Sequence, residues 1–173
     1  LVDLVRADAA WVPSGEGESL YLRPFAFASE AFLGVRPSTV VDYYVIASPS
    51  GSYFTNGLEP ISIWVTTDYH RAGRGGTGAA KTGGNYASSL LPQQEAHAQG
   101  CDQVCFLDDV SQRNLEELGG MNIMVVGADG AVRTPRLTGT ILEGSTRSAI
   151  IRLLRDSGRS VVEDTISLEA LLA

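Results

Sequence analysis

Lys81 is the residue of this 173-residue chain whose type and setting most clearly suggest chemistry. Of the 13 basic residues, 12 are arginines and Lys81 is the one lysine. It lies in the segment GGTGAAKTGG, residues 75–84, which has five glycines in ten residues. A lysine amine can lose its proton and attack a carbonyl carbon, whereas an arginine stays charged. Lys81 is therefore a candidate for covalent catalysis, and a solvated loop lysine is the alternative.

A phosphate-binding loop is a second interpretation of the same segment. Residues 75–82 nearly match the pattern G-x-x-x-x-G-K-[ST]. However, Ala80 replaces the glycine before the lysine, and residues 68–74 separate the loop from the preceding predicted strand. Gly83 and Gly84 follow, and glycine costs about 1 kcal/mol per helical position, so we expect no helix to begin there. The sequence therefore disfavours a nucleotide-binding loop.

Three further residues carry groups that a cofactor could use. Glu117 precedes two glycines and an apolar strand, which would hold its carboxylate near the core. Ser145 and Thr146 begin a predicted helix, where free N–H groups and the helix dipole favour a phosphate. On the residues alone, a surface glutamate and an ordinary helix cap remain the simpler interpretations.

Composition argues against several classes of protein. The net charge of −7 argues against a nucleic-acid-binding protein, which normally carries a basic stripe. No apolar run reaches the roughly 18 residues of a membrane-spanning helix. We expect Cys101 and Cys105 on one strand about 13 Å apart, too far for a disulfide, and hence reduced thiols in a cytoplasmic protein. His70 and His97 lack ligand spacing, so no metal site is expected.

The periodicity of the chain predicts an α+β (mixed α/β) fold. In the first predicted strand, Tyr21, Arg23, Phe25 and Phe27 share one face. Pro92 is expected to kink its helix or delay its start. Strands are predicted at 20–28, 38–48, 60–68, 103–108 and 159–164, with a hairpin at 121–135 turning at Asp129-Gly130. Helices are predicted at 1–9, 86–99 and 145–157, and after Ser167.

Six short motifs occur in a fixed order along the chain. They are LYLRPF at 20–25, SYF at 52–54, GGTGAAKTGGNY at 75–86, GCDQV at 100–104, EELGGMN at 116–122 and LEGSTR at 142–147. The set resembles the branched-chain amino acid aminotransferases, which are class IV, fold type IV pyridoxal-phosphate enzymes. The resemblance implies a small α/β domain and a large pseudo-barrel domain, with pyridoxal 5′-phosphate between them.

The resemblance implies a role for each matching residue. Lys81 matches the lysine that bonds covalently to the cofactor and moves a proton between substrate and cofactor. Tyr86 matches the tyrosine that hydrogen-bonds the phenolic oxygen of the cofactor, and Glu117 matches the acid that pairs with the pyridinium nitrogen. Ser145 and Thr146 match the helix start that binds the 5′-phosphate.

The resemblance also implies substrates and an assembly. The amino group of leucine, isoleucine or valine would pass to 2-oxoglutarate, giving branched 2-oxo acids and glutamate. Tyr21, Arg23 and Tyr53 match residues that line the substrate pocket, where Arg23 or a backbone donor would accept the glutamate carboxylate. Family members act as homodimers, so a homodimer is expected here, with no nucleic-acid or membrane partner.

The resemblance further implies a domain organisation. Residues 1–47 would end the small domain, residues 48–55 would form the linker, and residues 56–173 would form most of the large domain. We expect a central fragment of a longer protein, which by itself binds the cofactor weakly and is not an efficient transaminase. Gly120 stands where many members have threonine, and Pro92 also departs from the expected helix.

Two other kinds of protein remain open alternatives. D-amino acid aminotransferases and aminodeoxychorismate lyases would share the lysine and the glutamate. We do not expect KTGGNY and EELGGMN together in them, and a substrate panel that includes D-alanine would separate the activities. The other alternative is a truncated, inactive fragment that keeps the fold without the activity.

Overall fold

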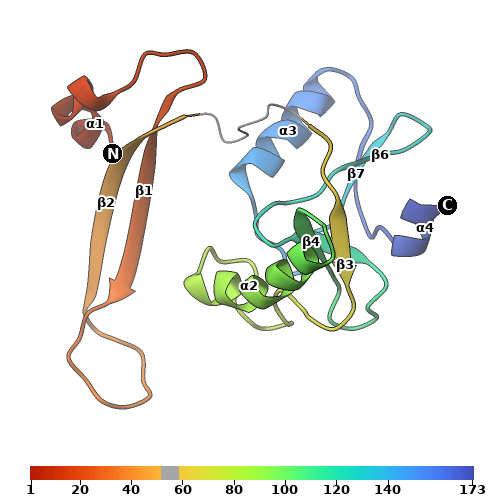
Figure 1. Ribbon diagram of the computed structural model, residues 1–173, viewed down its shortest axis with the longest axis horizontal. Coiled ribbons are helices and arrows are strands. Elements are labelled where there is room, and N and C mark those ends of the chain that lie inside the picture. The colour runs from red at the N-terminus through yellow and green to blue at the C-terminus, as the bar shows by residue number, and fades with distance from the viewer. Residues whose placement is uncertain (52–58) are drawn as a thin grey trace. The chain divides into compact units, whose positions relative to one another are not determined.

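A computed structural model describes residues 1–51 and 59–173 of the chain, and these form two compact units (Figure 1). Unit 1 is Leu1–Glu59 and unit 2 is Pro60–Ala173. Residues 52–55 of the segment predicted as a linker, 48–55, lie outside the described residues. Its first residues, 48–50, belong to the second strand of unit 1.

Unit 1 is built around one long hairpin. Its elements are α1 (Val2–Ala7), a short 3-10 helix (Ala9–Trp11), β1 (Ser19–Ala28) and β2 (Val41–Ser50), which pairs antiparallel with β1. The rings of Phe25, Phe27 and Tyr44 stack on one face at centroid distances of 5.7–6.2 Å. The Arg23 guanidinium lies 5.1 Å from the Tyr21 ring centroid. The predicted common face is therefore present, and no described residue of this unit is fully buried.

Unit 2 contains two three-stranded sheets, and the central strand of the first separates two small hydrophobic cores. The first sheet has the order β3 (Ile63–Thr66), β4 (Gln103–Leu107) and β5 (Leu115–Leu118), with β3 parallel and β5 antiparallel to β4. Val104 and Phe106 of β4 pack with Ala96 of α2 (Gly83–Ala98), which lies against the sheet (Figure 1). The alternate residues Cys105 and Leu107 face the other core, because successive strand residues point to opposite faces.

Helix α2 corrects two predictions. It begins at Gly83, so the two glycines are helical, and Thr82 precedes the first turn. Pro92 lies inside the helix and does not delay its start, while the expected kink stays a prediction. The Pro92 side chain is among the fully buried ones, and packing of this kind offsets the missing backbone hydrogen bond. Tertiary contacts thus override the weak local propensities of glycine and proline.

Strand β5 was not predicted, because its sequence LEEL does not alternate. Leu107 pairs with Leu115 and Cys105 pairs with Leu118, so three steps along β5 match two along β4. The extra residue is a β-bulge, which re-aims side chains locally. Leu115 and Leu118 therefore both reach the same core, although they are three residues apart.

The remaining elements follow the sequence predictions closely. They are β6 (Val125–Val126), β7 (Val132–Thr134), α3 (Ser145–Asp156), β8 (Val161–Glu163) and α4 (Leu168–Leu172). The second sheet has the order β6-β7-β8. The predicted hairpin joins β6 to β7 and turns at Gly130, which has φ +76°. Ser167 caps α4 as predicted, and its hydroxyl accepts a hydrogen bond from Ala170 N at 3.1 Å.

The cysteines are free, as predicted, but they do not share a strand. Cys101 precedes β4, and Cys105 lies buried within it. Burial raises the pKa of the Cys105 thiol to about 12. Among the helices of the described residues, none is long and apolar enough to cross a membrane.

Candidate active site

Lys81 and Tyr86 meet at the start of α2. The Lys81 Nζ donates a hydrogen bond to the Tyr86 hydroxyl at 2.7 Å and lies 5.1 Å from its ring centroid. Both residues are exposed, Tyr86 by 37%. The amine is thus held at a defined position and remains reachable by a ligand.

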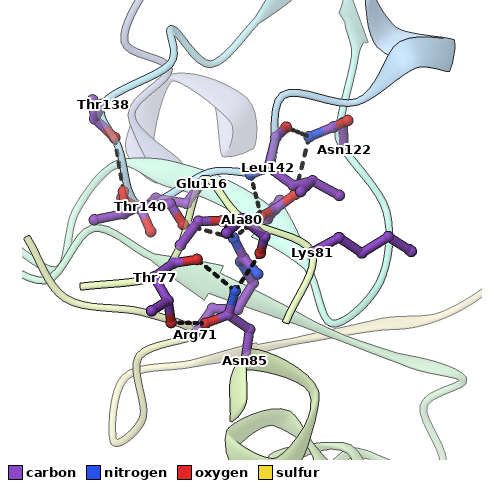
Figure 2. Close-up of polar contacts among 12 residues, drawn as sticks. Arg71, Thr77, Ala80, Lys81, Asn85, Glu116, Asn122, Thr138, Thr140 and Leu142 are labelled. Carbon is purple, nitrogen blue, oxygen red and sulfur yellow. Dashed lines mark hydrogen bonds and ion pairs between the residues drawn. The ribbon is translucent and has the colours of Figure 1, made fainter. Parts of the chain in front are cut away.

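The backbone before Lys81 is fixed by Asn85 from the first turn of α2. The buried Asn85 amide donates to the carbonyls of Thr77 and Ala80, both at 2.8 Å, and its oxygen accepts from the Thr77 hydroxyl at 2.8 Å. Figure 2 shows these bonds on one side of the loop, with the Lys81 side chain extending away from them. The glycine-rich loop is therefore hydrogen-bonded to α2, the helix that contains Tyr86.

The glycine at position 78 allows the same loop to approach a second loop. A Cβ atom added at Gly78 would lie 2.5 Å from the Thr140 backbone. The Ala79 N–H also donates to the Gly139 carbonyl at 3.1 Å. The absence of a side chain at Gly78 therefore allows the two loops to pack backbone against backbone.

Glu117 is buried, and among the described residues its carboxylate has two hydrogen-bond donors and one ion-pair partner. Its exposure is 3%. Oε1 accepts from the Leu142 N–H at 2.9 Å and pairs with Arg71 Nη2 at 2.5 Å, while Oε2 accepts from the Asn122 amide at 2.9 Å. Burial raises the pKa of Glu117, and the Leu142 N–H and the Arg71 charge oppose that rise.

A second buried carboxyl, Glu116, lies beside this group. The Thr140 hydroxyl donates to Glu116 Oε1, while Oε2 is buried without a hydrogen-bond partner among the described residues. Burial raises the pKa of Glu116, and the negative charges of Asp109 and Asp108 add to the effect. The neighbouring carboxyls of β5 thus compete for the positive charge of Arg71.

The predicted helix start is present at Ser145 and Thr146, the first residues of α3. Gly144 precedes the helix, and no side chain caps its first turn. The chain reaches this helix directly from Leu142, whose N–H donates to Glu117. The first N–H groups of a helix bind anions well, so a phosphate near Glu117 could use them.

Together these groups offer chemistry that matches three features of one kind of flat ligand. The amine of Lys81 can bond to a carbonyl carbon, the buried carboxylate of Glu117 can accept from a protonated ring nitrogen, and the α3 N-terminus can accept a phosphate. Among the described residues, no group of His, Cys, Asp and Glu is arranged to hold a metal ion.

Not all predicted site residues can be brought together. Tyr21 and Arg23 contact each other on β1 of unit 1, whose position relative to unit 2 is not determined. Tyr53 lies outside the described residues. Their assignment to a substrate pocket stays a prediction.

Sequence reasoning missed the residues that hold this site in place. Asn85 and Asn122 lie inside the motifs GGTGAAKTGGNY and EELGGMN, and this position is the sequence signal that points to them. Arg71 is one of 12 arginines and stands in no recognisable pattern. Its contacts join segments distant in sequence, so only the fold identifies it.

The chain is similar to known proteins over nearly its whole length. The chain is 54% identical to a branched-chain-amino-acid aminotransferase of Mycobacterium tuberculosis over 98% of its length, but it spans 47% of that protein. It resembles the crystal structure of an Escherichia coli branched-chain amino acid aminotransferase, with TM-score 0.76 and 36% identity over 88% of this chain and 51% of that one.

A third comparison involves a structure in its cofactor-bound form. The branched-chain amino acid aminotransferase from Thermobaculum terrenum, in its PLP-form, matches with TM-score 0.78 and 26% identity, over 95% of this chain and 51% of that one. The family model described as amino-transferase class IV matches residues 2–173. The predicted class IV fold is thereby confirmed, and the chain belongs to the class IV aminotransferases.

Proposed function

We propose that this sequence carries the lysine-bearing half of a pyridoxal-phosphate-dependent branched-chain aminotransferase. The observation that carries the proposal is the contact between Lys81 Nζ and the Tyr86 hydroxyl. The same unit of the fold also buries the carboxylate of Glu117. The chain spans about half the length of the relatives it matches, so the activity proposed is that of the full-length protein.

The residues of this chain would divide the work as follows. When bound, the cofactor supplies an electrophilic aldehyde carbon and a ring that delocalises negative charge. Lys81 would bond to that carbon and, once released by the substrate, would carry a proton between the substrate Cα and the cofactor. Tyr86 would hydrogen-bond the phenolic oxygen and hold the Lys81 amine in place.

Glu117 and α3 would fix the two ends of the ring. The ionised carboxylate of Glu117 would accept a hydrogen bond from the ring nitrogen and so keep it protonated. The backbone N–H groups at Ser145 and Thr146 would bind the 5′-phosphate, since free N–H groups and the helix dipole favour an anion.

The proposed substrates are leucine, isoleucine or valine as amino donor and 2-oxoglutarate as acceptor. The names of the relatives support the branched-chain donor, and the motif resemblance supports the acceptor. We assign Tyr21, Arg23 and Tyr53 to the substrate pocket on the same resemblance. If Arg23→Ala left the glutamate half-reaction unchanged, the role of Arg23 in binding that carboxylate would be wrong.

We also propose a homodimeric protein of the cytoplasm that serves branched-chain amino acid biosynthesis. The free thiols of Cys101 and Cys105 support a reducing compartment. The division of the chain into two compact units, Leu1–Glu59 and Pro60–Ala173, supports the proposed order of small domain, linker and large domain.

The test is chemical trapping at Lys81. The full-length protein is incubated with pyridoxal phosphate, reduced with borohydride, digested and mapped by mass spectrometry. We expect an adduct on Lys81 that disappears when leucine is added before reduction, because amino transfer frees the lysine. Residues 1–173 alone are expected to give a weaker adduct.

A matched control is Lys81→Arg, which keeps the positive charge but cannot form the bond. The α-amino terminus is the internal control for unspecific labelling. Labelling of the terminus without labelling of Lys81 would reject the proposal. Loss of the adduct with D-alanine but not with leucine would reject the branched-chain substrate while keeping the cofactor.

A further inference from the structure

Arg71 occupies a buried junction between three segments of unit 2. Its exposure is 6%, and its Nη2 lies 2.5 Å from Glu117 Oε1, 2.7 Å from the Gly78 carbonyl and 2.8 Å from the Thr140 carbonyl. One guanidinium nitrogen therefore connects the lysine loop, strand β5 and the loop that leads to α3 (Figure 2).

The charge of Arg71 matters because both groups of the pair are buried. A buried carboxylate without a positive partner takes up a proton instead of remaining charged. Among the charged groups that act on Glu117, Arg71 favours the ionised form and Glu116 opposes it. Arg71 is thus the cation that can keep this carboxylate ionised.

The contacts also show which oxygen of Glu117 is available. A carboxylate oxygen accepts about two hydrogen bonds. Oε1 accepts from the Leu142 N–H and also lies in the ion pair with Arg71, whereas Oε2 accepts only from the Asn122 amide. Among these contacts Oε2 is therefore the less crowded oxygen, and it can accept a second hydrogen bond.

We propose that Arg71 is a positioning residue that acts through Glu117. It orients the ionised carboxylate so that Oε2 accepts the N–H of a protonated ring nitrogen, and it fixes the lysine loop in the same arrangement through Gly78. The inference rests on the proposed function, because it assigns Arg71 a role toward the cofactor ring.

The test is a double-mutant cycle of Arg71→Gln and Glu117→Gln in the full-length protein. The dissociation constant of pyridoxal phosphate is measured by absorbance titration, and the unfolding free energy of the cofactor-free protein is measured in urea. Residues that act as one unit give non-additive effects, so we expect the double variant to bind about as weakly as Glu117→Gln alone, each single change costing about tenfold.

Two further readouts separate charge from packing. Arg71→Lys retains the charge and is expected to recover part of the affinity. Arg71→Gln is expected to bind pyridoxal phosphate more weakly than the unchanged protein. This difference in affinity should become smaller as the pH rises from about 6 to about 9, because the unpaired Glu117 then ionises. The same pyridoxal phosphate titrations in a Glu116→Gln background show how much of this pH dependence comes from the neighbouring carboxyl of Glu116.

Additive losses in the cycle, or an Arg71→Lys variant no better than Arg71→Gln, would overturn the inference and leave Arg71 a purely structural residue. If Arg71→Gln does not fold, the cycle is made with Arg71→Lys and Glu117→Gln. The part of the affinity that Arg71→Lys still loses should then be absent in the Glu117→Gln background. If the unchanged protein binds no pyridoxal phosphate at all, the proposed function fails. The unfolding cycle still tests the coupling between Arg71 and Glu117 in that case.

Discussion

Lys81 Nζ and the Tyr86 hydroxyl lie 2.7 Å apart, although Lys81 belongs to a loop and Tyr86 to a helix. Tyr86 is the fourth residue of α2, so the position of the hydroxyl follows from where the helix begins. The bonds of Asn85 to the loop carbonyls fix that start.

The first prediction concerns this contact. Tyr86→Phe keeps the ring and removes the acceptor of the Lys81 hydrogen bond. We expect the pyridoxal phosphate concentration for half-maximal trapping at Lys81 to rise about three- to tenfold, because hydrogen bonds of this kind contribute roughly 0.5–1.5 kcal/mol. Trapping curves that coincide with those of the unchanged protein would show that the contact does not position the amine.

The second prediction concerns the close approach of two loops. Gly78→Ala places a Cβ 2.5 Å from the Thr140 backbone, so the loops must separate. We expect a loss of about 1–3 kcal/mol in the free energy of unfolding, measured in urea. Gly84→Ala is the matched control: its Cβ would meet nothing within 4 Å, and a helical alanine should stabilise by about 0.5–1 kcal/mol. Equal effects of the two changes would contradict the role of Gly78.

The third prediction concerns Asn85. Asn85→Asp removes both amide donors and leaves the carbonyls of Thr77 and Ala80 without them. We expect a loss of about 1–3 kcal/mol in unfolding free energy and faster hydrogen exchange in residues 77–81. The exposed Gln94 of the same helix provides a control, since Gln94→Ala should change neither measurement. Unchanged exchange in Asn85→Asp would show that other contacts hold the loop.

The fourth prediction concerns the pH dependence of stability. Burial raises the pKa of Glu116 above its ordinary value of 4.5, so the folded state holds this proton more tightly than the unfolded state. The contribution to stability is therefore complete below about pH 4.5 and declines as the pH rises through the folded-state pKa.

Glu116→Gln removes this titration. Relative to the unchanged protein, the variant should gain stability as the pH rises, by at most about 1.4 kcal/mol per pH unit. Urea unfolding measured at several pH values checks this. A difference between the two proteins that stays constant with pH would show that Glu116 is not a buried titrating group.

Sequence patterns predicted correctly those features that residues close together in the sequence specify. The alternation at Tyr21, Arg23, Phe25 and Phe27, and the Ser167 cap, are both present in the structure. These signals lie within a few residues of the structure they specify. The motifs likewise identified Lys81 and Glu117, whose roles remain predictions.

Contacts between distant segments account for what sequence reasoning missed. Pro92 remains inside a helix because tertiary packing buries it, and Arg71 meets Glu117 across 46 residues of sequence. Strand β5 was overlooked because its pairing with β4 contains a bulge, which no alternation rule anticipates.

Deleting Glu116 or deleting Glu117 produces one and the same protein, because the two residues are identical and adjacent. The shortened strand would read Leu-Glu-Leu, which alternates without a bulge and keeps both leucines on the core face. Its one glutamate would then be the only carboxyl that this strand offers to Arg71. Two carboxyls are buried here because β5 has one residue more than regular pairing needs. Loss of one codon at either position would leave one buried carboxyl and would keep both leucines in the core.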